Sequence, residues 1–250
     1  MLLEKLYQTK IKMQKQGDKL FGPIRRIFLN PRDFTVISCN CWDWAVYSRY
    51  QLPYSSPTTN LLFPPSEFLK FISDMPRYLK EELVQIDLNS FSYRDYVMDR
   101  DKKGGWGDKN PEDFIYARLG DVDFVAWHYS TFEEVKDKWN RRRERVNFDK
   151  LLFKMHDMWN CTFDEFKEFL RLTEGKNALF LTAKKEWKKY AASNPNVIYV
   201  EKFADYGYVV DDVHHYVLPF NLTRYLNGLW GKDRNKGEHQ INSRNTNNHI

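Results

Sequence analysis

The chain has 250 residues, of which 42% are hydrophobic, so it can bury a sizeable core within one large domain. Its three cysteines, Cys39, Cys41 and Cys161, are odd in number and unevenly spaced, which argues against a disulfide framework and fits a reducing compartment. The net charge of +5 comes from one end, because residues 1–32 carry eight basic against two acidic residues, and this pattern is not that of a nucleic-acid-binding globule.

The segment 1–28 is predicted to form a basic helix, since its apolar residues recur at loosely helical spacing among lysines. Such a helix can lie on an anionic membrane surface. It can equally pack on its own domain or on a partner, because residues 14–18 interrupt the apolar stripe. The chain lacks a run of about 20 apolar residues and the apolar core of a signal peptide. We therefore expect a cytoplasmic protein, with peripheral association at the inner face of the membrane through residues 1–28 as an alternative.

The next elements are a strand and a long irregular stretch. Residues 34–39 form a short apolar run that predicts a buried strand, followed by a loop with Asn40, Cys41 and Trp42. The proline-rich residues 52–65 continue that loop. A helical pattern runs from Ser66 towards Leu83, and residues 99–112, rich in charge and glycine, predict an exposed loop.

The middle of the chain alternates strands and helices. Residues 121–127 predict a strand that ends at His128, and Thr131 with Glu134 has the spacing of a capping box for the next helix. Thr162 with Glu165 repeats that spacing. Residues 178–182 and 197–200 predict two more strands around a lysine-rich helix.

This alternation predicts an α/β fold of three layers, α/β/α, with a mixed, partly parallel central sheet. We expect residues 1–32 to be a basic amphipathic N-terminal segment, residues 33–230 to be a single α/β domain, and residues 231–250 to be a disordered polar tail. In such sheets ligands gather beyond the carboxyl ends of the strands.

Three residues are candidates for catalysis. Cys41 and His128 each follow a predicted strand, so a thiol could be activated by an imidazole at one sheet edge. A buried structural cysteine and a hydrogen-bonded histidine explain the same positions. Asp121-x-Asp123 resembles the acidic element with which many sugar-nucleotide transferases hold a divalent cation, although alternation at the start of a strand also explains it.

Four basic residues, Lys138, Arg141, Arg142 and Arg145, share one face of the helix after His128 and could bind phosphate or carboxylate groups. Pairing of Glu134 with Lys138 and of Asp137 with Arg141 would instead stabilise a solvated helix. The pairs Asp211-Asp212 and His214-His215 could ligate a metal, but they fit no defined ligand spacing, so we interpret this segment as a polar loop and assign no metal-binding residue. The sequence does not identify a cofactor.

Several segments resemble the family called domain of unknown function 1919, whose members are often described as exopolysaccharide-biosynthesis proteins. The matching pieces are ISCNCW at 37–42, YSSPT at 54–58, LGDV at 119–122, HYSTFEE at 128–134, KWNRR at 138–142 and RVN at 145–147, with a weaker match of NALFLT at 177–182. The chain departs from the family at Cys39, where asparagine is usual, and at Asp43 and Trp44, where glycines are usual. The resemblance implies a bacterial surface-polysaccharide pathway rather than a particular reaction.

We therefore carry three hypotheses. In the first, a transferase modifies or extends a glycan, with donor phosphates on the Lys138 to Arg145 face and Trp42 and Tyr54 against a saccharide or nucleotide-sugar substrate. Within the matching pieces, the further substrate-binding candidates are Asn40, Ser56 and Tyr129. In the second, Cys41 and His128 perform acyl transfer or hydrolysis on a glycan. In the third, a non-catalytic accessory protein docks on a polysaccharide synthesis complex.

Overall fold

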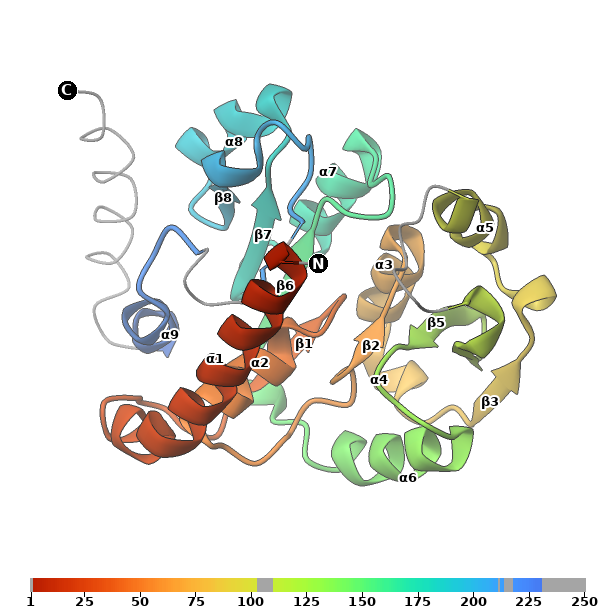
Figure 1. Ribbon diagram of the computed structural model, residues 1–250, viewed down its shortest axis with the longest axis horizontal. Helices are drawn as coiled ribbons and strands as arrows, with labels where there is room; N and C mark the ends of the chain where they lie inside the picture. Colours follow the sequence, from red (N-terminus) through yellow and green to blue (C-terminus); the bar gives the residue numbers. More distant parts are fainter. Residues whose placement is uncertain (1, 103–109, 211, 214–217, 231–250) are drawn as a thin grey trace.

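The computed structural model describes residues 2–102, 110–210, 212–213 and 218–230 (Figure 1). Within these residues the strands form two four-stranded sheets. Sheet A is parallel, in the order β1 (Thr35–Ser38), β6 (Leu151–His156), β7 (Ala178–Thr182) and β8 (Val197–Tyr199). Sheet B is antiparallel, in the order β2 (Leu61–Leu62), β5 (Val122–Ala126), β4 (Ile115–Leu119) and β3 (Leu83–Ile86).

Sheet A has helices on both faces because successive side chains of each strand alternate between two cores. On one face Met155 and Phe180 pack with Phe166 of α7 (Phe163–Leu172), and α8 (Lys188–Ser193) covers the same core. On the other face Leu152 and Leu181 pack with α2 (Trp42–Tyr50) and α9 (Leu222–Trp230). The structure thus confirms the α/β fold, and sheet A has the expected helix, sheet and helix layers.

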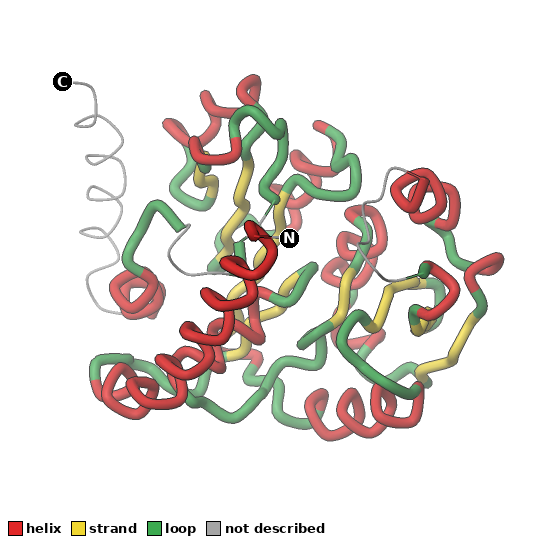
Figure 2. The backbone as a smooth tube through the Cα atoms, in the orientation of Figure 1, coloured by secondary structure: helices red, strands yellow, loops and turns green. Residues whose placement is uncertain are grey.

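Sheet B holds the antiparallel strands of the mixed fold and forms the other half of the molecule (Figure 2). Strands β4 and β5 form a hairpin whose turn needs the positive φ of 62° at Gly120. One face of the sheet packs Phe63 and Phe124 against α3 (Pro65–Ser73), α4 (Met75–Tyr78) and α6 (Phe132–Arg143), in the same core as sheet A. The opposite face forms a smaller aromatic core near α5 (Arg94–Lys102).

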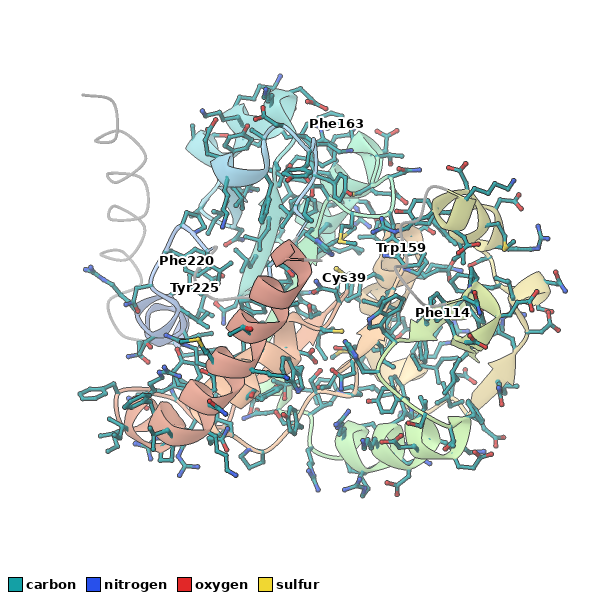
Figure 3. All side chains as sticks on the ribbon, viewed as in Figure 1. Cys39, Phe114, Trp159, Phe163, Phe220 and Tyr225 are labelled. Atoms are coloured by element: carbon teal, nitrogen blue, oxygen red, sulfur yellow. The ribbon has the colours of Figure 1, made fainter. Side chains whose placement is uncertain are left out.

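The two sheets meet at the end of β1. The Phe63 amide donates a hydrogen bond of 2.9 Å to the Cys39 carbonyl oxygen, which joins the segment after β2 to the segment after β1. Figure 3 places Cys39 near the middle of the molecule, between the strands of the two halves. The carboxyl end of β1 is therefore covered from the side by sheet B.

Both predicted helix caps are present. The Thr162 hydroxyl accepts from the Glu165 amide at 3.2 Å and Glu165 accepts from the Thr162 amide at 2.7 Å, which completes a capping box. The Thr131 hydroxyl accepts from the Glu134 amide at 3.2 Å, whereas the Glu134 carboxylate accepts from the amide of Ser130, one residue earlier than expected.

The remaining elements are short turns and the N-terminal helix. The 3-10 turns are Leu88–Ser90, Pro111–Asp113, Phe148–Lys150, Lys185–Trp187 and Glu201–Phe203. Helix α1 (Leu2–Ile27) confirms the predicted helix at the start of the chain. None of the helices within the described ranges is long and apolar enough to cross a bilayer. The predicted disordered tail, residues 231–250, lies outside the described residues.

Candidate functional site

A buried polar cluster lies at the carboxyl edge of sheet A. Along β6 the side chains of Leu152, Lys154 and His156 alternate onto the α2 face, and Lys154 stands opposite Ser38 of β1 in the parallel register. The Lys154 side chain is 0% exposed and that of His156 is 3% exposed. Charged groups buried this fully need charged or hydrogen-bonding partners within the protein.

Lys154, Asn40 and Asp212 form a closed ring of hydrogen bonds. The Lys154 ammonium donates to Asn40 Oδ1 at 2.8 Å and also to Asp212 Oδ2. Asn40 Nδ2 donates to Asp212 Oδ1 at 2.8 Å. Asn40 Oδ1 further accepts from the Ser38 hydroxyl at 3.0 Å, which fixes the side chain just after β1. The ring therefore ties three segments together that are far apart in the sequence.

Asp157 brings Asp212 to this edge. Its buried carboxylate accepts hydrogen bonds from the Thr182 hydroxyl at 2.8 Å, the Ala183 amide at 2.7 Å and the Val209 amide at 2.6 Å. Burial raises the pKa of Asp157 above its ordinary value despite these bonds. Since Val209 is fixed to the ends of β6 and β7, the segment that follows it is positioned over the strand ends.

The electrostatics of the cluster keep Asp212 ionised and His156 neutral. Burial alone would raise the pKa of Asp212, but Lys154 and the hydrogen bond from Asn40 hold it below its ordinary value. Burial, reinforced by the positive charge of Lys154, lowers the pKa of His156 to about 3. Among the described residues, Nδ1 of His156 has no hydrogen-bond partner, and it lies 3.9 Å from Asp212 Oδ2. A neutral imidazole beside a fixed carboxylate can accept a proton.

The cysteines nearby are buried thiols. Burial raises the pKa of Cys39 to about 11 and raises the pKa of Cys41 further, with Asp43 adding to the effect at Cys41. Cys41 precedes α2 and is 6% exposed. The predicted partner, His128, is exposed in the turn after β5, with its ring against Trp127. These surroundings favour the protonated thiol at Cys41.

Asp121 lies apart from His128. It occupies the turn between β4 and β5, whereas His128 follows the other end of β5, a strand of five residues that spans roughly 17 Å. The Asp121 carboxylate accepts from the Tyr78 hydroxyl at 2.8 Å and lies 3.6 Å from Arg77. Asp121 therefore belongs to the surface of sheet B and not to the edge of sheet A.

A second buried cluster brings together several residues that the sequence placed in the binding site. Arg142 donates to the Tyr129 hydroxyl at 2.8 Å and to the Thr59 carbonyl oxygen at 3.3 Å, and its guanidinium lies 5.3 Å from the centre of the Tyr54 ring. Asp43 accepts from the Thr59 hydroxyl at 2.8 Å. Burial raises the pKa of Asp43 to about 6, against the effect of its hydrogen bonds and of Arg142.

The other predicted binding residues have structural contacts of different kinds. Lys138 pairs with Glu134 at 2.5 Å, and Arg141 pairs with Asp137 at 2.9 Å on the outside of α6. Arg145 donates to the Tyr54 carbonyl oxygen at 3.4 Å. The Ser56 and Thr58 hydroxyls are 2.9 Å apart, and Trp42 is 0% exposed within the core on α2. Arg142 alone of the four basic residues on this face is buried.

No group of three or more His, Cys, Asp or Glu side chains suited to a metal ion occurs within the described ranges. Asp211, His214 and His215 lie outside the described residues, whereas Asp212 is the ion-pair partner of Lys154. The contacts of Asp212 are thus those of an ion pair with an ammonium group.

Comparison with known proteins places the chain in a family. A family model described as "Domain of unknown function (DUF1919)" matches residues 13–226. The chain belongs to this family. This DUF1919 protein is also 24% identical over 152 residues to an uncharacterized protein of Haemophilus influenzae, a match that covers 61% of the chain and 63% of the length of that relative.

The site residues predicted from the sequence do not include Lys154 and His156, the central residues of the cluster at the carboxyl edge of sheet A. The signal was present in LLFKMH at 151–156, where basic side chains recur every second residue within an apolar run. In a strand with helices on both faces, this alternation places both side chains on one buried face. A lysine and a histidine forced into a core in this way are typical of functional sites.

Proposed function

We propose that this DUF1919 protein is a bacterial exopolysaccharide or capsule biosynthesis enzyme that transfers a group between a phosphate-bearing donor and a saccharide. Its active centre would be the cluster of Asn40, Lys154, His156 and Asp212. The resemblance of the sequence to exopolysaccharide-biosynthesis proteins supports the pathway. The position beyond the carboxyl ends of parallel strands, where α/β folds bind their ligands, supports the site.

The state of His156 carries the proposal. The His156 imidazole is neutral at neutral pH, and within the described part of the chain its Nδ1 has no hydrogen-bond partner, so this nitrogen is placed to accept a proton. In the proposed step, Nδ1 takes the proton of the attacking sugar hydroxyl while the hydroxyl oxygen forms a bond to the transferred group. The bond from that group to the donor phosphate breaks at the same time, and the phosphate leaves with the bonding electron pair. The Asp212 carboxylate, held by Lys154 and Asn40, stabilises the imidazolium that results. Lys154 and Asn40 act as positioning residues.

Arg142 supports a donor site next to this centre. Asn40 belongs to the first cluster and Asp43 to the second, and both stand at the start of α2. Arg142 with Tyr54 and Tyr129 presents a guanidinium and two aromatic rings, the groups that bind phosphates and sugar rings. The exposed Arg141, paired with Asp137, has no such surroundings.

A ligand screen with four variants tests the proposal. The full chain is heated with a panel of nucleotide sugars, with and without Mg²⁺ or Mn²⁺. A donor at a hundred times its Kd adds about 2.7 kcal/mol, which raises Tm by roughly 5 to 10 °C. With that donor and a saccharide acceptor, His156→Gln should keep the Tm shift but lower the transfer rate about 100-fold or more. Asn40→Ala should lower both the Tm shift caused by the donor and the rate of transfer.

His128→Gln and Cys41→Ser are the matched controls, and both should retain transfer. Loss of transfer in these two variants with full activity in His156→Gln would replace the proposal by the Cys41 and His128 mechanism. If no donor raises Tm under any condition, the enzyme assignment fails and an accessory role takes its place.

A further inference from the structure

Helix α1 packs on the rest of the protein with its polar side. Asp18 is 4% exposed; it accepts from Arg25 of the same helix at 2.5 Å and lies within reach of the positive charge of Arg49 on α2. Arg26 donates to the Gln51 carbonyl oxygen at 3.1 Å. Gly22 faces the end of α2 so closely that an added Cβ would overlap the Gln51 side chain and lie 3.3 Å from the Arg49 carbonyl oxygen. The contact with α2 thus uses a carboxylate, a glycine and arginines in place of an apolar stripe.

The outward side of α1 is apolar. Six large hydrophobic side chains in and just after this helix are between 48% and 68% exposed: Met13, Leu20, Phe21, Ile24, Ile27 and Phe28. At about 100° per residue they fall within roughly one third of the helix circumference, opposite Asp18 and Gly22. An ordinary surface helix buries its apolar stripe and exposes its polar side. Among the α1 side chains that the structure describes the arrangement is the reverse, so this apolar face is available to an external partner.

Positive charge accompanies this face. Residues 1–32 hold eight of the basic residues of the chain and only two acidic ones, while the rest of the chain is nearly neutral. Lys12 and Lys19 are exposed on α1, about 60° and 80° round the helix from the near edge of the apolar stripe. Aliphatic stems of lysine can lie along an apolar surface while the ammonium groups reach anionic headgroups.

We propose that α1 docks this protein on an anionic lipid bilayer, with the face formed by Met13, Leu20, Phe21, Ile24, Ile27 and Phe28 in the boundary between headgroups and acyl chains. A basic helix with one apolar face binds such a boundary by apolar burial together with attraction to anionic lipids. A second copy of the chain is a poorer occupant, because pairing two α1 faces would bring two clusters of positive charge together. The proposal concerns α1 alone and does not depend on the site at sheet A.

Vesicle sedimentation of the full chain tests the proposal. The protein is mixed with vesicles of phosphatidylcholine alone or of phosphatidylcholine with the anionic lipid phosphatidylglycerol. We expect sedimentation with the anionic vesicles only, weakened by salt. The variant Leu20→Gln, Ile24→Gln, Phe28→Gln should lower the partition coefficient about tenfold or more, because it removes three apolar side chains from the interface. Lys12→Gln with Lys19→Gln should lower it by about tenfold as well.

The control variant carries Val84→Gln and Phe148→Gln, which remove two apolar side chains that are each 52% exposed elsewhere on the molecule. It should sediment like the unmodified chain, and urea unfolding should give all variants the same midpoint because the substituted side chains are exposed. Failure of the unmodified chain to sediment with anionic vesicles at low salt would overturn the proposal. Equal sedimentation with both lipid mixtures, or a dimer by light scattering that the triple variant abolishes, would also overturn it.

Discussion

His156 and Asp43 give the stability of the protein opposite dependences on pH. The pKa of His156 falls from 6.5 in the unfolded chain to about 3 in the folded protein, so its contribution is present above pH 6.5 and is lost as pH falls towards 3. The pKa of Asp43 rises from 3.8 to about 6, so its contribution is present below pH 3.8 and is lost as pH rises through 6. Between pH 3.8 and 6 the two effects oppose each other.

The variant His156→Gln should separate the contribution of His156 to the pH dependence of stability from that of Asp43. Relative to the unmodified protein, the variant should gain stability as pH is lowered from 7 to 4, by up to about 1.4 kcal/mol per pH unit, because it no longer excludes a proton that the unfolded chain binds. Urea unfolding at a series of pH values measures the difference. Asp43→Asn is the control and should gain relative stability as pH is raised. Parallel profiles for His156→Gln and the unmodified protein would show that the imidazole titrates normally.

Site residues that lie in segments resembling the family can be predicted from the sequence. Site residues that are brought together only by contacts between distant segments cannot. The sequence predicts Tyr54, Tyr129 and Arg142 as binding residues, and in the structure Arg142 contacts both tyrosines. The sequence around Asp212 predicts only a polar loop, because nothing in its neighbours indicates that Asp212 lies against Lys154 of β6. A buried ion pair between distant segments depends on the fold and leaves no local spacing.

The capping box of α7 is an element-scale feature with a measurable effect. Thr162→Ala removes the acceptor of the Glu165 amide and should lower the free energy of unfolding by about 1 kcal/mol. Thr162→Ser keeps the hydroxyl and should remain close to the unmodified protein. Chemical unfolding of both variants tests this, and equal losses in the two would assign the effect to the threonine methyl group instead.

The predicted elements follow the strength of their local patterns. The apolar runs that became β1, β5, β7 and β8 were predicted as strands, and both threonine caps were predicted as helix starts. The sequence predicts a loop where the structure has α2, because most side chains of this helix are buried and its sequence therefore lacks the one-sided apolar pattern of a surface helix. The sequence does not predict strand β6, because Lys154 and His156 interrupt its apolar run. Helix α5 begins ahead of a segment predicted to be an exposed loop and extends into it.

At the scale of the whole molecule, one core connects the two sheets. Phe63 and Phe124 of the sheet B half belong to the same hydrophobic cluster as Phe153 and Phe180 of sheet A. Residues 33–230 should therefore unfold as one unit, as the prediction of a single domain requires. The division into two sheets could not be predicted, since strand order depends on pairings between distant segments.

The variant Phe124→Ala tests whether the two halves of the protein unfold together. The side chain is 0% exposed, and its loss should cost about 3 to 5 kcal/mol through lost burial and the cavity left behind. Circular dichroism and tryptophan fluorescence should report one coincident urea transition for both proteins, displaced in the variant. Val84→Ala, at a position 52% exposed, is the control and should change stability by less than about 0.5 kcal/mol. Two separate transitions would mean that the halves unfold independently.

The order of strands in sheet A has a consequence for biosynthesis. Strand β1 pairs only with β6 within the described sheet, and all of sheet B lies between these strands in the chain. A ribosome that adds about 5 to 20 residues per second completes β1 on the order of ten seconds before β6 is made. During that interval the apolar segment Thr35–Ser38 has no strand to pair with and is exposed to other nascent chains. We therefore expect chaperones to bind this segment during translation.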